Sequence, residues 1–182
     1  MTANRTVDMR IVPDVLPAST PPRWPHPGLV LRSDDTYIVG REKIREFARV
    51  ILAIDPAHHD VDAAQKAGYA DIVAPPTFTA VVTATLIRDM LTTPGAGIDM
   101  GTHTPIHVNE KITVAAPILA GDVLTASMTI TSVTERGDAV FLDTETRLRT
   151  AAGESRSTVV SSILVAPNAE SARPEPESVG AR

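Results

Sequence analysis

The chain has 182 residues, 43% of them hydrophobic, which is enough for one well-buried domain and too few for two. The formal net charge of −5 excludes the basic surface that binds phosphate backbones, so nucleic acid is not expected as a partner. Since cysteine is absent, disulfides and thiolate metal sites are excluded as well.

The N-terminal residues do not predict a secretory signal, because a basic start followed by an apolar run is missing. The longest apolar stretch, about residues 78–87, is far shorter than the ~20 residues that span a bilayer. We therefore expect a cytoplasmic protein without membrane insertion.

Proline is concentrated near both ends, with six of the 15 prolines between Pro13 and Pro27 and three between Pro167 and Pro176. Regular structure is disfavoured at that density. We predict an extended arm over residues 1–34, a folded domain over 35–166 and a disordered tail over 167–182. Trp24, the sole tryptophan, could pack across the domain or a partner chain, but a plain extended arm is the preferred interpretation.

Three helices are predicted before the strands. The first follows Gly40 and ends before Pro56, and it has a buried stripe at i, i+3, i+4, i+7 and i+8 formed by Ile44, Phe47, Ala48, Ile51 and Leu52. A short second helix is indicated by the capping-box spacing of Asp62 and Gln65, and Gly68 ends it. Residues 77–91 are apolar or small on every side until Arg88, which predicts a helix buried all round.

Beyond the third helix the apolar period changes to two, which is typical of strands. The residues expected on one face of successive strands are Ile106, Val108, Ile112 and Val114; Leu124, Ala126, Met128 and Ile130; and Val140, Leu142, Thr144, Thr146 and Leu148. A last strand covers 157–165, and His103 and His107 are expected to face solvent. An apolar helix followed by long antiparallel strands predicts an α+β fold in which one sheet wraps around a central helix, as in the hotdog fold.

From about Tyr37 to Val165 the chain resembles the MaoC-like (R)-3-hydroxyacyl thioester dehydratases and hydratases. Residues 40–48 (GREKIREFA) are similar to the opening helix of that family, 68–78 (GYADIVAPPTF) to its loop into the central helix, and 117–124 (PILAGDVL) to its mid-sheet turn. Their order and spacing match most closely the accessory subunits of the heterodimeric (3R)-hydroxyacyl-ACP dehydratase of mycolic-acid-type fatty acid elongation.

Active members of that family carry a D-x-N-P-x-H loop, in which the histidine takes the substrate α-proton and the aspartate handles the departing hydroxyl. Alignment on Pro56 puts Ala53 at the catalytic aspartate, while Asp55 falls at the asparagine and His58 at the histidine. Pro75 falls where active members have a glycine whose N–H polarises the thioester carbonyl, and proline has no N–H to donate. The resemblance thus implies the loss of two catalytic groups.

The resemblance also implies substrate contacts at Pro75, Pro76, Thr77, Phe78 and Asn109. For Asn109, an ordinary polar residue at a strand edge is the simpler interpretation. Small residues on the central helix are compatible with an acyl-chain tunnel or with close helix–sheet packing: Ala80, Val81, Val82, Ala84 and Thr85.

His58 has three interpretations. It is a vestigial or substrate-contacting residue, a working base with Asp55 or Asp60 as substitute acid, or a metal ligand with His59 and Asp60. The last spacing matches no common zinc motif, so neither a metal nor a cofactor is expected.

Three functions remain open. The preferred one is the acyl-chain-binding subunit of a (3R)-hydroxyacyl-ACP or -CoA dehydratase in fatty acid elongation, paired with a catalytic MaoC-like subunit. The alternatives are an independent homodimeric enoyl-thioester hydratase that uses His58 and Asp55, and a non-enzymatic module that binds acyl thioesters. A hotdog thioesterase is disfavoured, because the central helix has no carboxylate before Asp89.

Overall fold

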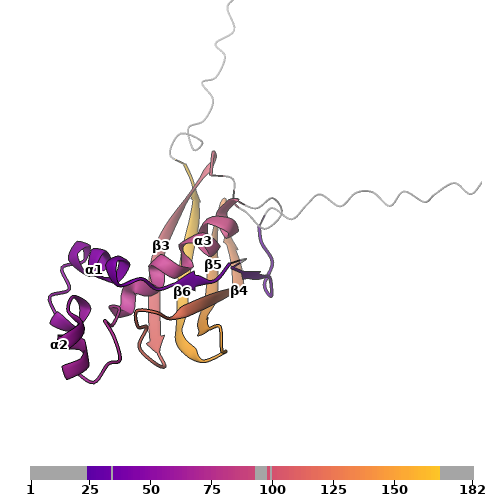
Figure 1. Ribbon diagram of the computed structural model, residues 1–182. Helices are drawn as coiled ribbons and strands as arrows, with labels where there is room; N and C mark the ends of the chain where they lie inside the picture. Colours follow the sequence, from indigo (N-terminus) through magenta and orange to yellow (C-terminus); the bar gives the residue numbers. More distant parts are fainter. Residues whose placement is uncertain (1–23, 34, 93–97, 99, 169–182) are drawn as a thin grey trace, which may run out of the picture.

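The strands form one antiparallel sheet that holds a helix against one of its faces (Figure 1). The computed structural model describes residues 24–33, 35–92, 98 and 100–168. In chain order the elements are β1 (Val30–Arg32), β2 (Tyr37–Ile38), α1 (Arg41–Val50), the 3-10 turn η1 (Pro56–His58), α2 (Val61–Lys66), the 3-10 turn η2 (Pro76–Phe78), α3 (Thr79–Thr92), β3 (His103–Val114), β4 (Val123–Arg136), β5 (Ala139–Thr150) and β6 (Ser155–Pro167).

The strand order in the sheet is β1-β4-β5-β6-β3, and β2 also pairs with β4. Strand β3 pairs with β6 on one side and ends the order, so its other side is a sheet edge within the described residues. Helix α3 lies across one face of the sheet, with α1 and α2 to one side (Figure 1). This arrangement confirms the predicted α+β hotdog fold, in which the sheet wraps around one central helix.

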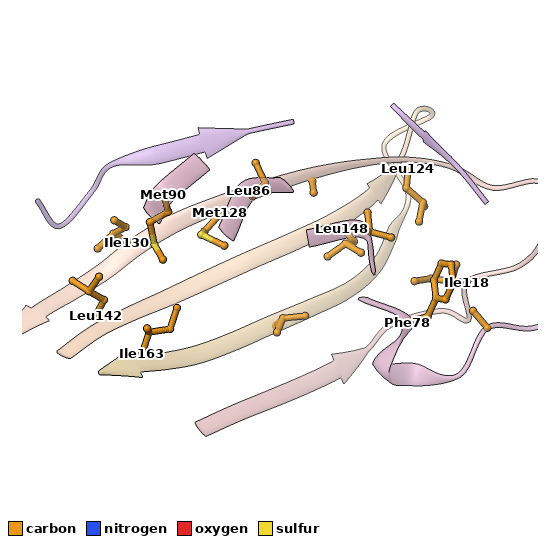
Figure 2. Packing of buried hydrophobic residues seen from close by; sticks show 14 of the residues in the cluster. Phe78, Leu86, Met90, Ile118, Leu124, Met128, Ile130, Leu142, Leu148 and Ile163 are labelled. Atoms are coloured by element: carbon orange, nitrogen blue, oxygen red, sulfur yellow. The ribbon is translucent and has the colours of Figure 1, made fainter. Parts of the chain in front are cut away.

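The core lies between α3 and the inner face of the sheet. Alternate residues of β4, β5 and β6 point inward, as the period of two predicts, and they meet Leu86 and Met90 of α3 (Figure 2). The common face predicted for Ile106, Val108, Ile112 and Val114 of β3 is wrong, because the pairing with β6 shifts between His107 and Asn109 and puts Ile106 and Ile112 on opposite faces. The inward residues of β5 are all buried: Val140, Leu142, Thr144, Thr146 and Leu148. None of the helices in the described part of the chain is long and apolar enough to cross a membrane.

The folded body begins earlier than the sequence predicts. Trp24 is only 6% exposed and its ring meets the edge of the His103 ring, with the two centroids 5.2 Å apart. Residues 30–32 form β1 on β4. The extended arm predicted over 1–34 is therefore wrong from Trp24 onward, because burying the indole outweighs the irregular backbone that proline imposes. His103 is half-buried against Trp24 rather than facing solvent.

At the other end, β6 continues to Pro167, and the Asn168 N–H donates to the Thr102 carbonyl. The predicted tail boundary at 167 is thus two residues early. Residues 1–23 and 169–182, over which the rest of the arm and the tail were predicted, lie outside the described residues.

Helix α1 ends at Val50, two residues before the predicted stripe does. Leu52 has a φ of +58°, and the N–H groups of Leu52 and Ala53 donate to the carbonyls of Arg49 and Ala48. These bonds form a Schellman motif with leucine where glycine is usual. The motif turns the chain away from the core, so Ile51 and Leu52 are 42% and 81% exposed instead of buried.

Two further expectations about the helices are wrong. The N-cap of α2 is Asp60, whose carboxylate accepts a hydrogen bond from the Ala63 N–H, so the helix begins before the predicted cap at Asp62. Helix α3 is not buried all round, because Ala80, Ala84 and Thr85 are exposed. Their small size had suggested burial, but the sheet covers only one side of the helix.

Candidate functional site

A cavity of about 350 Å³ lies at the N-terminal end of α3, and we call it the site cavity. It brings together the loop at η1, the loop that leads into η2, and the link between β3 and β4. The lining residues are Asp55, His58, Tyr69, Val73, Ala74, Pro75, Pro76, Val114, Pro117, Ile118 and Ser157. Two of the three segments that carry the family resemblance therefore meet at one site.

Backbone pairing holds these two segments together. The Ala74 N–H donates to the Ile118 carbonyl at 2.8 Å, and the Ala120 N–H donates to the Ile72 carbonyl at 2.9 Å. The Val73 N–H in turn donates to the Ala57 carbonyl of η1 at 3.1 Å. Backbone hydrogen bonds thus hold the loop before α3 on both sides, and they fix the positions of its residues in the site cavity.

His58 is half-buried, and the position of its proton follows from its partner. Its Nδ1 lies 2.7 Å from the Val73 carbonyl oxygen, which can only accept a hydrogen bond. Nδ1 therefore carries the proton, and in the neutral ring Nε2 keeps its lone pair. A histidine in this tautomer can accept a proton or a hydrogen bond from a ligand in the site cavity.

Asp55 lines the same cavity but already has a structural role. Its Oδ1 accepts a hydrogen bond from the Ala57 N–H at 2.9 Å, which caps η1. Asp55 is exposed. The structure therefore brings Asp55 and His58 to one site, as the alternative active-site hypothesis requires.

The neighbouring His59 and Asp60 are used elsewhere. His59 Nε2 lies 2.7 Å from the Ala53 carbonyl oxygen and donates to it, while Asp60 caps α2. Within the described residues, no group of three His, Asp or Glu side chains is placed to hold a metal ion.

At the start of α3, neither Pro75 nor Pro76 can offer a backbone N–H to a ligand. Pro75 and Pro76 both line the site cavity, and neither has an N–H. The Phe78 N–H donates to the Pro75 carbonyl at 2.8 Å, so it is directed into the turn. The first amide N–H of this segment therefore belongs to Thr77, whose side chain is exposed.

The other residues expected to contact substrate are not among those that line the site cavity. Phe78 is fully buried in the core, where its ring meets Phe47 and Tyr37. Thr77 and Asn109 are exposed, and Asn109 follows the irregular step in the pairing of β3 with β6. Conversely, Tyr69 and Ser157 line the cavity without having been predicted.

The wall of the site cavity is held by a mostly buried ion pair. Arg156 Nε and Nη2 each donate to an Asp122 carboxylate oxygen at 2.9 Å, and the two side chains are 14% and 12% exposed. Burial pulls the pKa of Asp122 upward, but the hydrogen bonds from Arg156 and the Leu119 N–H outweigh it and leave the pKa below its ordinary value. The pair ties the turn beside Ile118 to β6.

A second cavity, of about 170 Å³, lies between α3 and the sheet, and we call it the helix–sheet cavity. The α3 residues in its lining are Thr83, Ile87 and Leu91. The strands contribute Pro105, His107, Glu110, Met128, Thr144, Thr146, Val159, Ser161 and Ile163.

None of the small residues predicted to leave room beside the central helix lines this cavity. Ala80 and Ala84 are exposed, while Val82 and Thr85 line a separate hollow of about 250 Å³ beside Tyr37. The empty space beside α3 is instead the helix–sheet cavity, which is lined by the strands nearest the β3 edge.

The chain is similar to known proteins in both sequence and structure. Residues 26–158 match the family described as "FAS1-like, dehydratase domain region". The UPF0336 protein of Clavibacter michiganensis subsp. michiganensis is 40% identical over 138 residues, which cover 76% of this chain and 91% of that protein.

Two solved structures are also similar. The C-terminally truncated HadBC complex, a (3R)-hydroxyacyl-ACP dehydratase of Mycobacterium tuberculosis, contains a chain that is 33% identical with a TM-score of 0.67, over 76% of this chain and 96% of that one. A structure named MaoC-like dehydratase is 31% identical with a TM-score of 0.69, over 81% of this chain and 43% of that chain.

Proposed function

Because this chain belongs to the MaoC-like hotdog dehydratase family, we propose that it is the acyl-chain-binding subunit of a (3R)-hydroxyacyl-thioester dehydratase, paired with a catalytic MaoC-like subunit. The observation that carries the proposal is the composition of the site cavity. His58 and Pro75 both line it. The family resemblance puts Pro75 at the position of the N–H donor, and it puts Ala53, in the loop before η1, at that of the catalytic aspartate.

The chemistry of dehydration supports this division of labour. Removing water from a 3-hydroxyacyl thioester needs a base for the α-proton, an acid for the hydroxyl and a donor for the developing oxyanion. The His58 Nε2 lone pair could supply the first, while Ala53 and Pro75 leave the other two without their usual groups. The partner subunit supplies all three, and this chain binds the substrate.

The helix–sheet cavity is the place in this chain for the acyl chain. Its lining includes the exposed edge-strand residues His107 and Glu110 as well as the half-buried Ile87 and the buried Ile163. An acyl chain held by a partner docked at the β3 edge can therefore enter between α3 and the sheet. The carrier is ACP or CoA, because both present the acyl group on the same pantetheine arm.

The β3 edge is the surface proposed for the partner. Within the part of the chain that the structure describes, the outer edge of this 12-residue strand has no partner strand, so a row of backbone donors and acceptors is open to pairing. Its apolar side chains are also exposed, with Ile106 at 47%, Val108 at 55% and Val114 at 47%. The Mycobacterium tuberculosis structure is itself a complex, which supports pairing with a second subunit.

Replacing Val108 with lysine is expected to weaken association with a MaoC-like subunit by at least about tenfold, because a charge would be left unpaired in the interface. The dissociation constant is measured by analytical ultracentrifugation of the two purified chains. Val160→Lys is the matched control, because Val160 is 43% exposed on the outer face of β6, one strand in from the edge. Equal weakening by both substitutions would remove the β3 edge as the docking surface.

The second candidate is an independent homodimeric hydratase that uses His58 and Asp55. Two observations favour it. Both side chains line one cavity, and His58 carries its proton on Nδ1, so that Nε2 keeps a lone pair. This alternative requires the purified chain to hydrate a trans-2-enoyl thioester without any partner.

A further inference from the structure

Polar side chains cross the otherwise apolar inner face of the sheet beneath α3. Thr144 of β5 pairs in register with Ser161 of β6, and Ser161 pairs with Glu110 of β3. Thr144 and Ser161 are 1% and 9% exposed. Because directly opposed residues point to the same face, these three side chains form one row across three strands.

Two more threonines extend this row around the helix–sheet cavity. Thr146 is the next inward residue of β5, and Thr83 projects from α3; they are 3% and 5% exposed. All five polar residues line the helix–sheet cavity. We call Thr83, Glu110, Thr144, Thr146 and Ser161 the polar row.

The polar row is not what close packing alone would select. Valine has nearly the shape of threonine and buries without a hydrogen-bonding requirement, whereas a buried hydroxyl must find a partner. Every buried side-chain nitrogen or oxygen in the described residues has one. A hydroxyl has one donor and two acceptor sites, so a single partner leaves capacity for a ligand oxygen.

The row reaches solvent at the edge strand. Ser161 Oγ lies 3.5 Å from Glu110 Oε2, and His107 Nε2 lies 3.5 Å from the same carboxylate oxygen. The pairing of β3 with β6 shifts between His107 and Asn109, and such bulges re-aim side chains. A polar path therefore runs from the β3 edge into the helix–sheet cavity.

Apart from His107 and the polar row, the side chains that line the cavity are apolar, and the cavity is small. They include Ile87, Leu91, Met128 and Ile163. A dry cavity of roughly 150 Å³ holds one benzene molecule, so about 170 Å³ accommodates about six carbon atoms. The ligand that fits both walls is a short hydrocarbon segment that carries an oxygen.

We propose that the helix–sheet cavity binds a segment of about six carbon atoms bearing a hydroxyl or keto oxygen, in preference to a plain hydrocarbon. The assignment of that segment to an acyl chain rests on the proposed function. The preference itself rests only on the polar row and the size of the cavity.

The preference is tested with phenol and benzene, a pair that differs by one oxygen. Binding to the purified full-length chain is followed by NMR through the methyl signals of Met128 and Ile163. Phenol is expected to bind at least about fivefold more tightly than benzene, and Thr144→Val or Ser161→Ala should bring that ratio to about one. Thr125→Val is the matched control, because Thr125 is exposed, and it should leave the ratio unchanged.

Equal binding of the two probes to the wild-type chain, no binding of either, or a ratio that survives both substitutions would overturn the preference. A separate experiment tests whether the bound segment belongs to an acyl chain. Octanoyl-pantetheine and 7-oxo-octanoyl-pantetheine are each added to the chain, and the same methyl signals are followed. If phenol binds as expected but neither thioester shifts these signals, the proposed function fails while the oxygen preference stands.

Discussion

Purified alone, the chain should hydrate a trans-2-enoyl thioester at least about 10³-fold more slowly than when combined with a MaoC-like subunit that has an intact D-x-N-P-x-H loop. A positioned acid or base contributes about 10²–10⁴-fold to the rate, and one oxyanion donor about 10²–10³-fold. Ala53 and Pro75 supply neither group. The rate is followed by the loss of enoyl-thioester absorbance at matched protein concentrations.

The control is a catalytic partner whose loop histidine is replaced by alanine, which should leave the mixture as slow as this chain alone. A rate for the isolated chain within tenfold of the mixture would contradict the subunit assignment. It would favour the homodimeric hydratase, with Asp55 as the acid beside His58.

Replacing Asp122 with asparagine should lower the free energy of unfolding by about 2–3 kcal/mol. Removing one partner of a fully buried ion pair costs about 3–5 kcal/mol, and the partial exposure of this pair reduces that figure. The variant leaves the guanidinium of Arg156 without its two charged hydrogen bonds. Urea unfolding measures the change.

The matched control for Asp122→Asn is Asp71→Asn, which removes a similar carboxylate bound by Arg41. That arginine side chain is 53% exposed, and solvent screening leaves exposed pairs with little effect on stability, so the loss should be much smaller. Similar losses in the two variants would show that burial does not set the strength of the Asp122–Arg156 pair.

The same pair predicts a dependence on pH. Because the folded state lowers the pKa of Asp122, its contribution is present above the unfolded pKa of about 3.9 and is lost as pH falls through the folded value. The wild-type chain should therefore lose more stability than Asp122→Asn below about pH 4. Parallel losses in the two proteins would exclude Asp122 as a source of acid sensitivity.

The fold could be predicted because β4, β5 and β6 carry a period of two that matches their burial. In β5, the stripe from Val140 to Leu148 points inward along its whole length, including Thr144 and Thr146. Predictions from local sequence patterns were wrong where a helix ends in an irregular turn. Nothing in the sequence near Leu52 indicates a positive φ, since glycine normally marks that position.

The site could be predicted in part, through single residues in a recognisable loop. His58, Asp55, Pro75 and Pro76 line one cavity, as their place in the resembling segments suggests. Tyr69 and Ser157 reach the same cavity only because β6 and the loop after α2 meet there in space. Ser157 carried a weak signal, since it is an inward position of the last strand.

The sequence indicated part of the polar row more clearly than it indicated Tyr69 or Ser157. Thr144 and Thr146 occupy consecutive inward positions of a strand whose other inward residues are apolar. Their meeting with Ser161 and Glu110 depends on strand register, which the apolar period alone does not fix. Exposure of Ala80 and Ala84 likewise depends on which side of α3 the sheet covers.

The central claim is that this chain binds substrate while its partner performs the chemistry, and His58→Ala in the reconstituted complex tests it most directly. The measured quantity is kcat/KM for hydration of a trans-2-enoyl thioester, relative to the complex with the unchanged chain. We expect the kcat/KM of the His58→Ala complex to stay within about twofold of that of the unchanged complex, because the catalytic histidine belongs to the partner. A loss of about a hundredfold or more would show that His58 acts on the substrate and would contradict the account.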